Sequence, residues 1–270
     1  MKIIGHRGCR GVLPENTIIA FKEAIKMGVY AIELDVVLSG DGKIVVSHEP
    51  FMSRVTCLKP CGNEITAEED KAFNLFKMPY AEIKTFDCGK KGNDKFPSQQ
   101  SLEAYKPLLS EVIKECEHYA KSLNTTVTYI IEIKSQPKWY GQFYPQPPSY
   151  VQILLKELQE FSLGTRVVLK SFDVAVLNEI KCQKPNQRIS LLVNKDELID
   201  AKLKQLEYRP EILGPYFKLL DCANVKKYQA LGYELLPWTV NDSSDMNRLL
   251  SYGVDGIITD YPNKLKALIQ

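Results

Sequence analysis

The sequence predicts an α/β protein that folds as a closed (β/α)8 (TIM) barrel. The chain has 270 residues, close to the length of about 250 residues that such a barrel needs as one domain. Short apolar runs rich in β-branched residues alternate about eight times with segments of helical periodicity, a pattern typical of a parallel sheet. A doubly wound open sheet is the alternative. No Gly-x-Gly-x-x-Gly follows a strand, which disfavours the nucleotide-binding version of that alternative.

The elements follow from these two periodicities. The apolar runs predict strands over residues 2–5, 31–37, 129–134, 166–172, 189–193, 212–215, 234–240 and 256–259. The intervening periodic segments predict helices over residues 17–27, about 105–122, 149–160, 173–181, 195–206, 221–231 and 243–251.

Two stretches interrupt the alternation. Ser39-Gly40-Asp41-Gly42 followed by Ile44-Val45-Val46 predicts a β-hairpin that extends the second strand past the barrel rim. Residues 50 to about 105 contain four prolines and few apolar periods, so we expect residues 1–270 to form a single barrel domain with an insertion there. The aromatic, proline-rich residues 135–149 follow a strand, which places them on the catalytic face of a barrel.

Composition excludes several classes of protein. Lys and Arg number 35 against 33 Asp and Glu, a net charge of +2 that gives no support for nucleic-acid binding or a polybasic membrane surface. No apolar run reaches the ~18 residues of a membrane span, so we expect no stable membrane insertion. The start of the chain shows no signal peptide, which predicts a cytoplasmic protein, although a trimmed periplasmic or secreted protein would look the same.

The seven cysteines are odd in number and scattered along the chain, which is not the pattern of a disulfide framework. Cys57 and Cys61 have no partner pair of Cys or His at zinc spacing. We therefore expect reduced, structural thiols.

Three carboxylates stand on strands that are otherwise apolar. Glu33 and Asp35 are two residues apart, so both point to the same side of their strand, and Glu132 repeats the pattern two strand positions before Lys134. Three buried carboxylates are hard to hold together without compensation, and oxygen ligands suit hard divalent ions. The sequence therefore predicts a metal site for Mg²⁺ or Ca²⁺. A wet sheet face with solvated acids is the alternative for the first two.

Two of the three histidines fall at strand ends. His6 ends the first strand, and His48 ends the return strand of the hairpin. A turn centred near Gly40-Asp41 would put Asp35 opposite Val46 and Glu33 opposite His48. His118 lies in a predicted helix beside two glutamates and is expected to be exposed.

The remaining candidates are Arg7 and Lys134, two cations suited to a phosphate, and Trp238, which could line the pocket or pack in the core. No Gly-x-Ser-x-Gly elbow and no phosphate-binding P-loop is present. Two histidines beside a hard metal and two cations favour metal-assisted cleavage of a phosphodiester, one histidine accepting a proton and the other donating one.

The same residues resemble the glycerophosphodiester phosphodiesterase family. The resemblance covers nearly the whole chain and rests on an ordered series of short motifs: His6-Arg7-Gly8, Pro14-Glu15-Asn16-Thr17, Ala20-Phe21, Glu33-Leu34-Asp35-Val36, Ser39, Asp41-Gly42, Val46-Ser47-His48, Glu132-Ile133-Lys134, Ser171-Phe172-Asp173, Trp238-Thr239-Val240-Asn241 and Gly253 to Pro262. It departs from the family at Glu49, where the family usually has Asp, and at Met52-Ser53-Arg54-Val55-Thr56, where the family has Leu-Asp-Arg-Thr-Thr.

This resemblance implies a (β/α)8 barrel that hydrolyses glycerophosphodiesters to sn-glycerol 3-phosphate and an alcohol. It implies that His6 and His48 are the acid–base pair and that Glu33, Asp35 and Glu132 bind one divalent cation, Mg²⁺ or Ca²⁺. Arg7 and Lys134 would hold the phosphate, and Trp238 would line the substrate pocket. The only partner expected is the small-molecule substrate.

Several alternatives stay open at this point. Water may attack phosphorus directly, or the glycerol 2-hydroxyl may attack first to give a cyclic phosphate. A phospholipase D-like or phosphoinositide-cleaving barrel would need an apolar rim, which the aromatic residues 135–149 could supply unless they form a packed lid. A catalytically silent phosphodiester-binding module is the third alternative.

Overall fold

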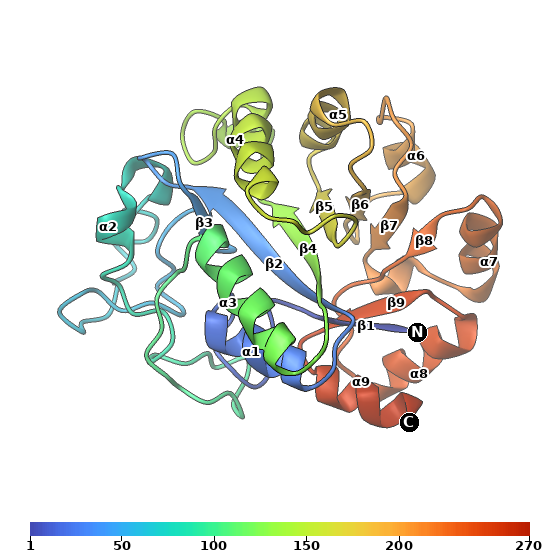
Figure 1. Ribbon diagram of the computed structural model, residues 1–270, viewed down its shortest axis with the longest axis horizontal. Coiled ribbons are helices and arrows are strands. Elements are labelled where there is room, and N and C mark those ends of the chain that lie inside the picture. Colours follow the sequence, from blue (N-terminus) through green and yellow to red (C-terminus); the bar gives the residue numbers. More distant parts are fainter.

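The computed structural model describes all 270 residues and shows eight parallel strands arranged as a nearly closed barrel (Figure 1). In spatial order the strands are β8 (Glu234–Leu235), β7 (Ile212–Pro215), β6 (Ile189–Val193), β5 (Val167–Ser171), β4 (Thr128–Ile133), β2 (Ala31–Leu38), β1 (Lys2–Gly5) and β9 (Gly256–Thr259). Backbone hydrogen bonds close the remaining gap, from Asp255 N to Leu235 O (3.2 Å) and from Ile258 N to Pro237 O (3.0 Å). The predicted barrel is confirmed.

Helices surround the strands (Figure 1). They are α1 (Ile18–Lys26), α3 (Leu109–Ser122), α4 (Pro147–Gln159), α5 (Val174–Gln183), α6 (Ile199–Leu203), α7 (Cys222–Ala230), α8 (Ser243–Tyr252) and α9 (Pro262–Ile269). Thr17, Asp173 and Asp221 each begin a helix by accepting a backbone N–H with the side chain. None of the helices is both long and apolar enough to cross a membrane.

The structure differs from the predicted elements in three places. The strand expected over 234–240 is only two residues long, and Pro237 within it has no N–H to donate to a sheet ladder. The helix expected over 195–206 spans only Ile199–Leu203, because Glu197 instead accepts the backbone N–H of Asn194 in a turn. The helix α9 was not predicted, although Pro262 stands at its first position.

Strand alternation divides the apolar residues between two layers. Ile32, Leu34 and Val36 belong to a core of 50 buried residues between the sheet and the helices. Ala31 belongs to a separate cluster of seven buried residues, contributed by strands and the segment after β8. Glu33 and Asp35 share the side of Ala31, so their carboxylates are placed above the inner cluster, toward the carboxyl ends of the strands.

The strand β2 continues into a hairpin with β3 (Ile44–Val46), as predicted, but the predicted register is wrong by one residue. Val36, not Asp35, is opposite Val46. The turn runs from Ser39 to Lys43, where Ser39 N donates to Lys43 O, and Gly42 takes the positive φ of 77° that the turn requires. His48 therefore is not cross-strand from Glu33.

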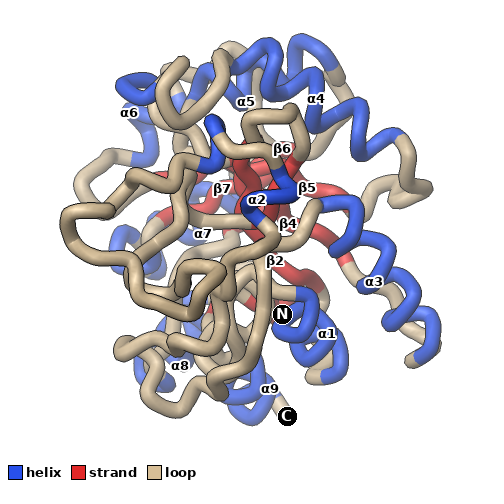
Figure 2. The backbone as a smooth tube through the Cα atoms, turned by 90° about the vertical axis from the view of Figure 1, so that its left-hand side faces the viewer, coloured by secondary structure: helices blue, strands red, loops and turns tan.

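Residues 47–108 contain no long helix or strand, only the short helices η1 (Leu75–Lys77) and α2 (Tyr80–Ile83) among loops (Figure 2). They contribute most of a second hydrophobic cluster of 14 buried residues. Phe143 and Tyr144, from the loop between β4 and α4, belong to the same cluster, and Trp139 packs against it.

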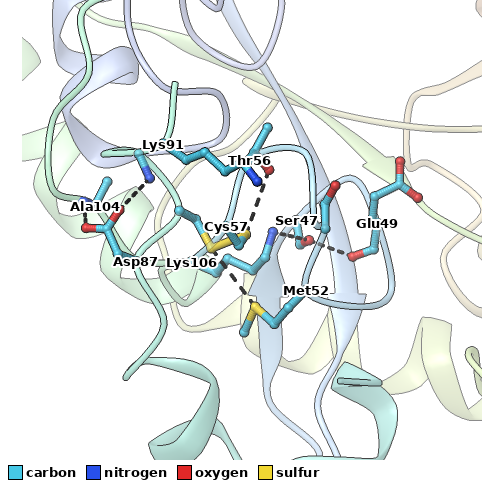
Figure 3. The surroundings of a disulfide bond; sticks show 12 residues. Ser47, Glu49, Met52, Thr56, Cys57, Asp87, Lys91, Ala104 and Lys106 are labelled. Carbon is cyan, nitrogen blue, oxygen red and sulfur yellow. Dashed lines mark hydrogen bonds between the residues drawn. A yellow bond between two sulfur atoms is a disulfide. The ribbon is translucent and has the colours of Figure 1, made fainter. Parts of the chain in front are cut away.

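The expectation that all cysteines are reduced is wrong. Cys57 and Cys88, 31 positions apart, form a disulfide inside this second cluster (Figure 3). Both side chains are buried, and the spacing of the cysteines gave no sign of the pairing because the insertion folds around it. The other five cysteines are free.

Candidate active site

Strand register brings the three predicted carboxylates together at the carboxyl ends of β2 and β4. Asp35 is the parallel-sheet partner of Glu132, and Glu33 is two residues earlier on β2. All three residues are buried, and one oxygen from each lies within 4.8 Å of the others. The alternative of a wet sheet face with solvated acids is therefore wrong.

Three cations of the chain surround these acids. Arg7 Nε lies 3.1 Å from Asp35 Oδ2, Lys134 Nζ lies 2.5 Å from Glu132 Oε1, and Lys170 Nζ lies 2.8 Å from Glu33 Oε1. Burial alone would raise the pKa of Asp35, but the charges of Arg7 and Lys134 and a hydrogen bond from Asn16 hold it well below its usual range. Lys134 and Lys170 likewise lower the pKa of Glu132, so Asp35 and Glu132 are ionised at neutral pH and the chain itself supplies part of the compensating charge.

Two carboxylate oxygens nevertheless lack a hydrogen-bond donor. Glu33 Oε1 and Asp35 Oδ1 are buried without one. The contact of Lys170 with Glu33 Oε1 is an ion pair without hydrogen-bond geometry, and the nearest cation to Asp35 Oδ1 is Lys134 Nζ at 3.8 Å. Buried oxygens without donors, held close together, are ligands that suit a hard divalent cation.

His6 is fixed by the strand that closes the barrel. Gly5 pairs with Thr259, so the next residues on each strand, His6 and Asp260, meet, and His6 Nδ1 lies 2.6 Å from Asp260 Oδ1. His6 Nε2 lies 3.9 Å from Glu33 Oε2. A carboxylate on Nδ1 fixes the proton there and leaves Nε2 to face the acids.

Asp260 is itself held by several donors. Arg10 donates to both of its oxygens at 2.9 and 3.0 Å, and Asn241 Nδ2 donates at 2.7 Å. Burial alone would raise the pKa of Asp260, but His6 and Arg10 lower it far below its usual range. Asp260 is therefore a fixed negative charge behind His6.

The side chain of His48 is more exposed to solvent than that of His6. Its Nδ1 lies 2.7 Å from Glu49 Oε1, so the glutamate at the position that departs from the family makes the orienting contact itself. Burial and the charges of Arg7 and Lys134 lower the pKa of His48. His48 is therefore neutral at pH 7 and lines a cavity of about 420 Å³ together with Glu132, Lys134 and Asp173.

Arg7 is held from both ends. Its backbone, at φ 50°, donates N–H to Glu33 Oε2 at 2.9 Å, and its guanidinium bonds Glu15 at 2.7 Å. Asn16 donates Nδ2 to Asp35 Oδ2 at 2.9 Å and accepts Asp35 N–H. The loop after β1 thus fixes two of the three acids.

Trp238 does not line this cavity. Its ring packs edge-on against Phe172 and Tyr216 and against the inner cluster, and its Nε1 donates to Gly214 O at 2.7 Å. Trp139, Phe143 and Tyr144 pack together on the insertion, as a packed lid would, so they do not form an exposed apolar rim. His118 is exposed, as predicted.

The predicted site did not include the residues that orient the others: Glu15, Asn16, Lys170 and Asp260. Glu15, Asn16 and Asp260 stand in the motifs that carry the family resemblance, but no role was predicted for them. Lys170 carried a usable signal, since it is a lysine inside an apolar strand. Asp260 directly follows the last strand, at the same level as His6. Glu15 and Asn16 stand in a loop where no periodicity indicates direction.

A family model described as the glycerophosphoryl diester phosphodiesterase family matches residues 6–264. The chain belongs to this family. The match spans every residue of the site described above, from His6 to Asp260. The barrel fold agrees with membership of this family, because a solved structure of a similar protein superimposes on the whole chain.

Two curated relatives are glycerophosphodiester phosphodiesterases. One, from Caldanaerobacter subterraneus subsp. tengcongensis, is 32% identical over 99% of this chain and 97% of its own length. The other, from Bacillus subtilis, is 31% identical over 96% of this chain and 83% of its own length.

Two crystal structures extend the comparison. A candidate glycerophosphoryl diester phosphodiesterase from Silicibacter pomeroyi is 30% identical, with a TM-score of 0.90 over all of this chain and 93% of its own. A phosphodiesterase from Oleispira antarctica, solved in complex with the product sn-glycerol-3-phosphate, is 25% identical, with a TM-score of 0.79 over all of this chain and 96% of its own.

Proposed function

We propose that this protein hydrolyses glycerophosphodiesters to sn-glycerol 3-phosphate and an alcohol, with one divalent cation, Mg²⁺ or Ca²⁺. The observation that carries the proposal is the convergence of Glu33, Asp35 and Glu132 within 4.8 Å, beside His6. The relatives of the same family and the product complex of the Oleispira protein support the substrate class.

Glu33, Asp35 and Glu132 would hold the cation, since two of their oxygens have no other hydrogen-bond partner. The cation, when bound, polarises the phosphoryl oxygens and neutralises their charge. Lys134, which lines the cavity, would hold a phosphate oxygen. Arg7 would join it by turning part of its guanidinium from Glu15 to the phosphate.

The two histidines have settings that suit opposite roles. His48, with its lowered pKa and its place in the cavity wall, is suited to accept a proton from the attacking oxygen. His6 is oriented by Asp260 on Nδ1, so its Nε2 faces the acids, and in its protonated form it would donate the proton on Nε2 to the leaving oxygen. The same pair serves direct attack by water and attack by the glycerol 2-hydroxyl. Hydrolysis in ¹⁸O-labelled water with rapid quench separates these two routes.

The test is turnover of glycerophosphocholine, glycerophosphoethanolamine and glycerophosphoglycerol, coupled to glycerol-3-phosphate dehydrogenase, with EDTA, Mg²⁺ or Ca²⁺. Activity that EDTA removes and one metal restores supports both the reaction and the cofactor. Activity that persists in EDTA contradicts the metal site. No turnover of any substrate with either metal contradicts the proposal, and it directs attention to lipid-linked diesters or to binding without catalysis.

A further inference from the structure

Lys170 is the most deeply buried of the three cations that contact the acids. Its side chain is 3% exposed, against 10% for Arg7 and 14% for Lys134, and of the three only Lys134 lines the cavity. Lys170 is therefore the cation least able to turn from the acids toward a phosphate.

The surroundings of Lys170 explain where its charge acts. Lys170 is the sheet partner of Glu132 on one side and of Ser190 on the other. Its Nζ lies 2.8 Å from Glu33 Oε1 and 3.4 Å from Glu132 Oε2, so it bridges two of the three candidate metal ligands. Lys170 makes no hydrogen bond to any other side chain. Val168, two residues earlier on β5, belongs to the apolar inner cluster, which offers the ammonium group no alternative partner.

The formal charges of the carboxylates and of Lys170 indicate what this contact does. The three carboxylates carry three negative charges, and Lys170 removes one of them from the inner side of the cluster. The two charges left match a single divalent ion. Arg7 and Lys134 also contact Asp35 and Glu132, but both are more exposed than Lys170, which leaves them able to turn to a phosphate.

We infer that Lys170 is a permanent internal counter-ion of the metal site, a positioning residue that keeps Glu33 and Glu132 in place without metal and lowers the affinity for the divalent ion. This inference rests on the proposed metal-dependent function. The physical reason is that a buried cation next to two ligands stabilises the metal-free carboxylates and repels an incoming cation. Lys170 thereby makes the metal site stable when empty and moderate in affinity.

The experiment compares the parent protein with Lys170→Met, which removes the charged ammonium group but keeps an unbranched side chain only one atom shorter. Mn²⁺ binding is measured by electron paramagnetic resonance after EDTA treatment and desalting, and thermal unfolding is followed with and without Mn²⁺. In Lys170→Met we expect the Mn²⁺ affinity to rise about tenfold or more. We also expect the Tm of the metal-free protein to fall and Mn²⁺ to raise it more than in the parent.

The controls separate charge from packing. Lys181→Met removes another buried lysine, which pairs with Glu211 far from the acids, and should leave Mn²⁺ affinity unchanged. Lys170→Arg keeps the charge and should bind Mn²⁺ like the parent. If Lys170→Met does not fold without metal, Lys170→Gln gives the same affinity comparison.

Mn²⁺ affinity that is unchanged or weaker in the charge-removing variant overturns the role of Lys170 while leaving the proposed function standing. A parent protein that binds no Mn²⁺, Mg²⁺ or Ca²⁺ overturns both.

Discussion

Replacing Asp260 by Asn is expected to lower kcat by about 10²–10⁴-fold and to change KM much less. Asp260 Oδ1 lies 2.6 Å from His6 Nδ1, so the carboxylate holds the imidazole ring in one orientation and in one tautomer. An amide at this position lets the ring adopt the wrong tautomer, and in a Ser-His-Asp triad the same replacement lowers kcat by about 10⁴-fold. The amide that replaces the carboxylate would also leave the guanidinium of Arg10 next to His6 without its negatively charged partner. This lowers kcat further.

The same substitution has a predicted pH dependence in stability. Since the pKa of Asp260 is lowered by folding, its ionised form stabilises the native protein above the ordinary aspartate pKa near 4, and this contribution is lost as the pH falls toward the lowered value. The difference in Tm between parent and variant should therefore be largest at neutral pH and shrink in acid.

The assay is steady-state hydrolysis of glycerophosphocholine in the restoring metal, with thermal unfolding measured from pH 3 to pH 8. Asp255→Asn is the matched control, because Asp255 precedes the opposite end of β9 and accepts the backbone N–H of Leu235 away from the histidines. It should lose stability but keep kcat. A kcat for Asp260→Asn within tenfold of the parent would refute the role of Asp260 in orienting His6.

Three further substitutions, with His118→Ala as a control for the last, test the metal ligands, the disulfide and His48. Glu33→Gln should abolish activation by metal and lower the Tm of the metal-free protein, since Lys170 loses its nearest partner; activation like that of the parent contradicts the ligand assignment. Cys57→Ser should reduce the free energy of unfolding by about 3–4 kcal/mol, from the 31-position loop that the disulfide closes, and should make stability insensitive to dithiothreitol, whereas an unchanged denaturation midpoint speaks against the disulfide. His48→Ala should reduce kcat by about 10²–10⁴-fold, and His118→Ala should not change it; equal activities would remove His48 from the mechanism.

The sequence by itself determined the barrel and the directions of the side chains in the candidate site. Alternation has a period of two along any strand, so Glu33 and Asp35 had to share the inner side whatever the neighbouring strands were. Parallel strands end at one rim, so His6, Glu132 and Lys134 had to approach them. These are properties of single elements and of their common direction, which local patterns encode.

The tertiary structure decided the pairings between elements. The hairpin register depends on whether Ser39 pairs with Lys43 across the turn, and a shift of one residue moves His48 relative to Glu33. Asp260 reaches His6 only because β9 closes against β1, and Cys57 meets Cys88 only because the insertion folds on its own cluster.

Lys170 is the clearest example of a residue whose strand the local sequence predicts but whose contacts only the tertiary structure decides. The strand pattern put a lysine on β5, but only the closed sheet placed its ammonium between Glu33 and Glu132. Contacts between residues far apart in the chain depend on packing free energy summed over the whole domain, and no short stretch of sequence contains that sum.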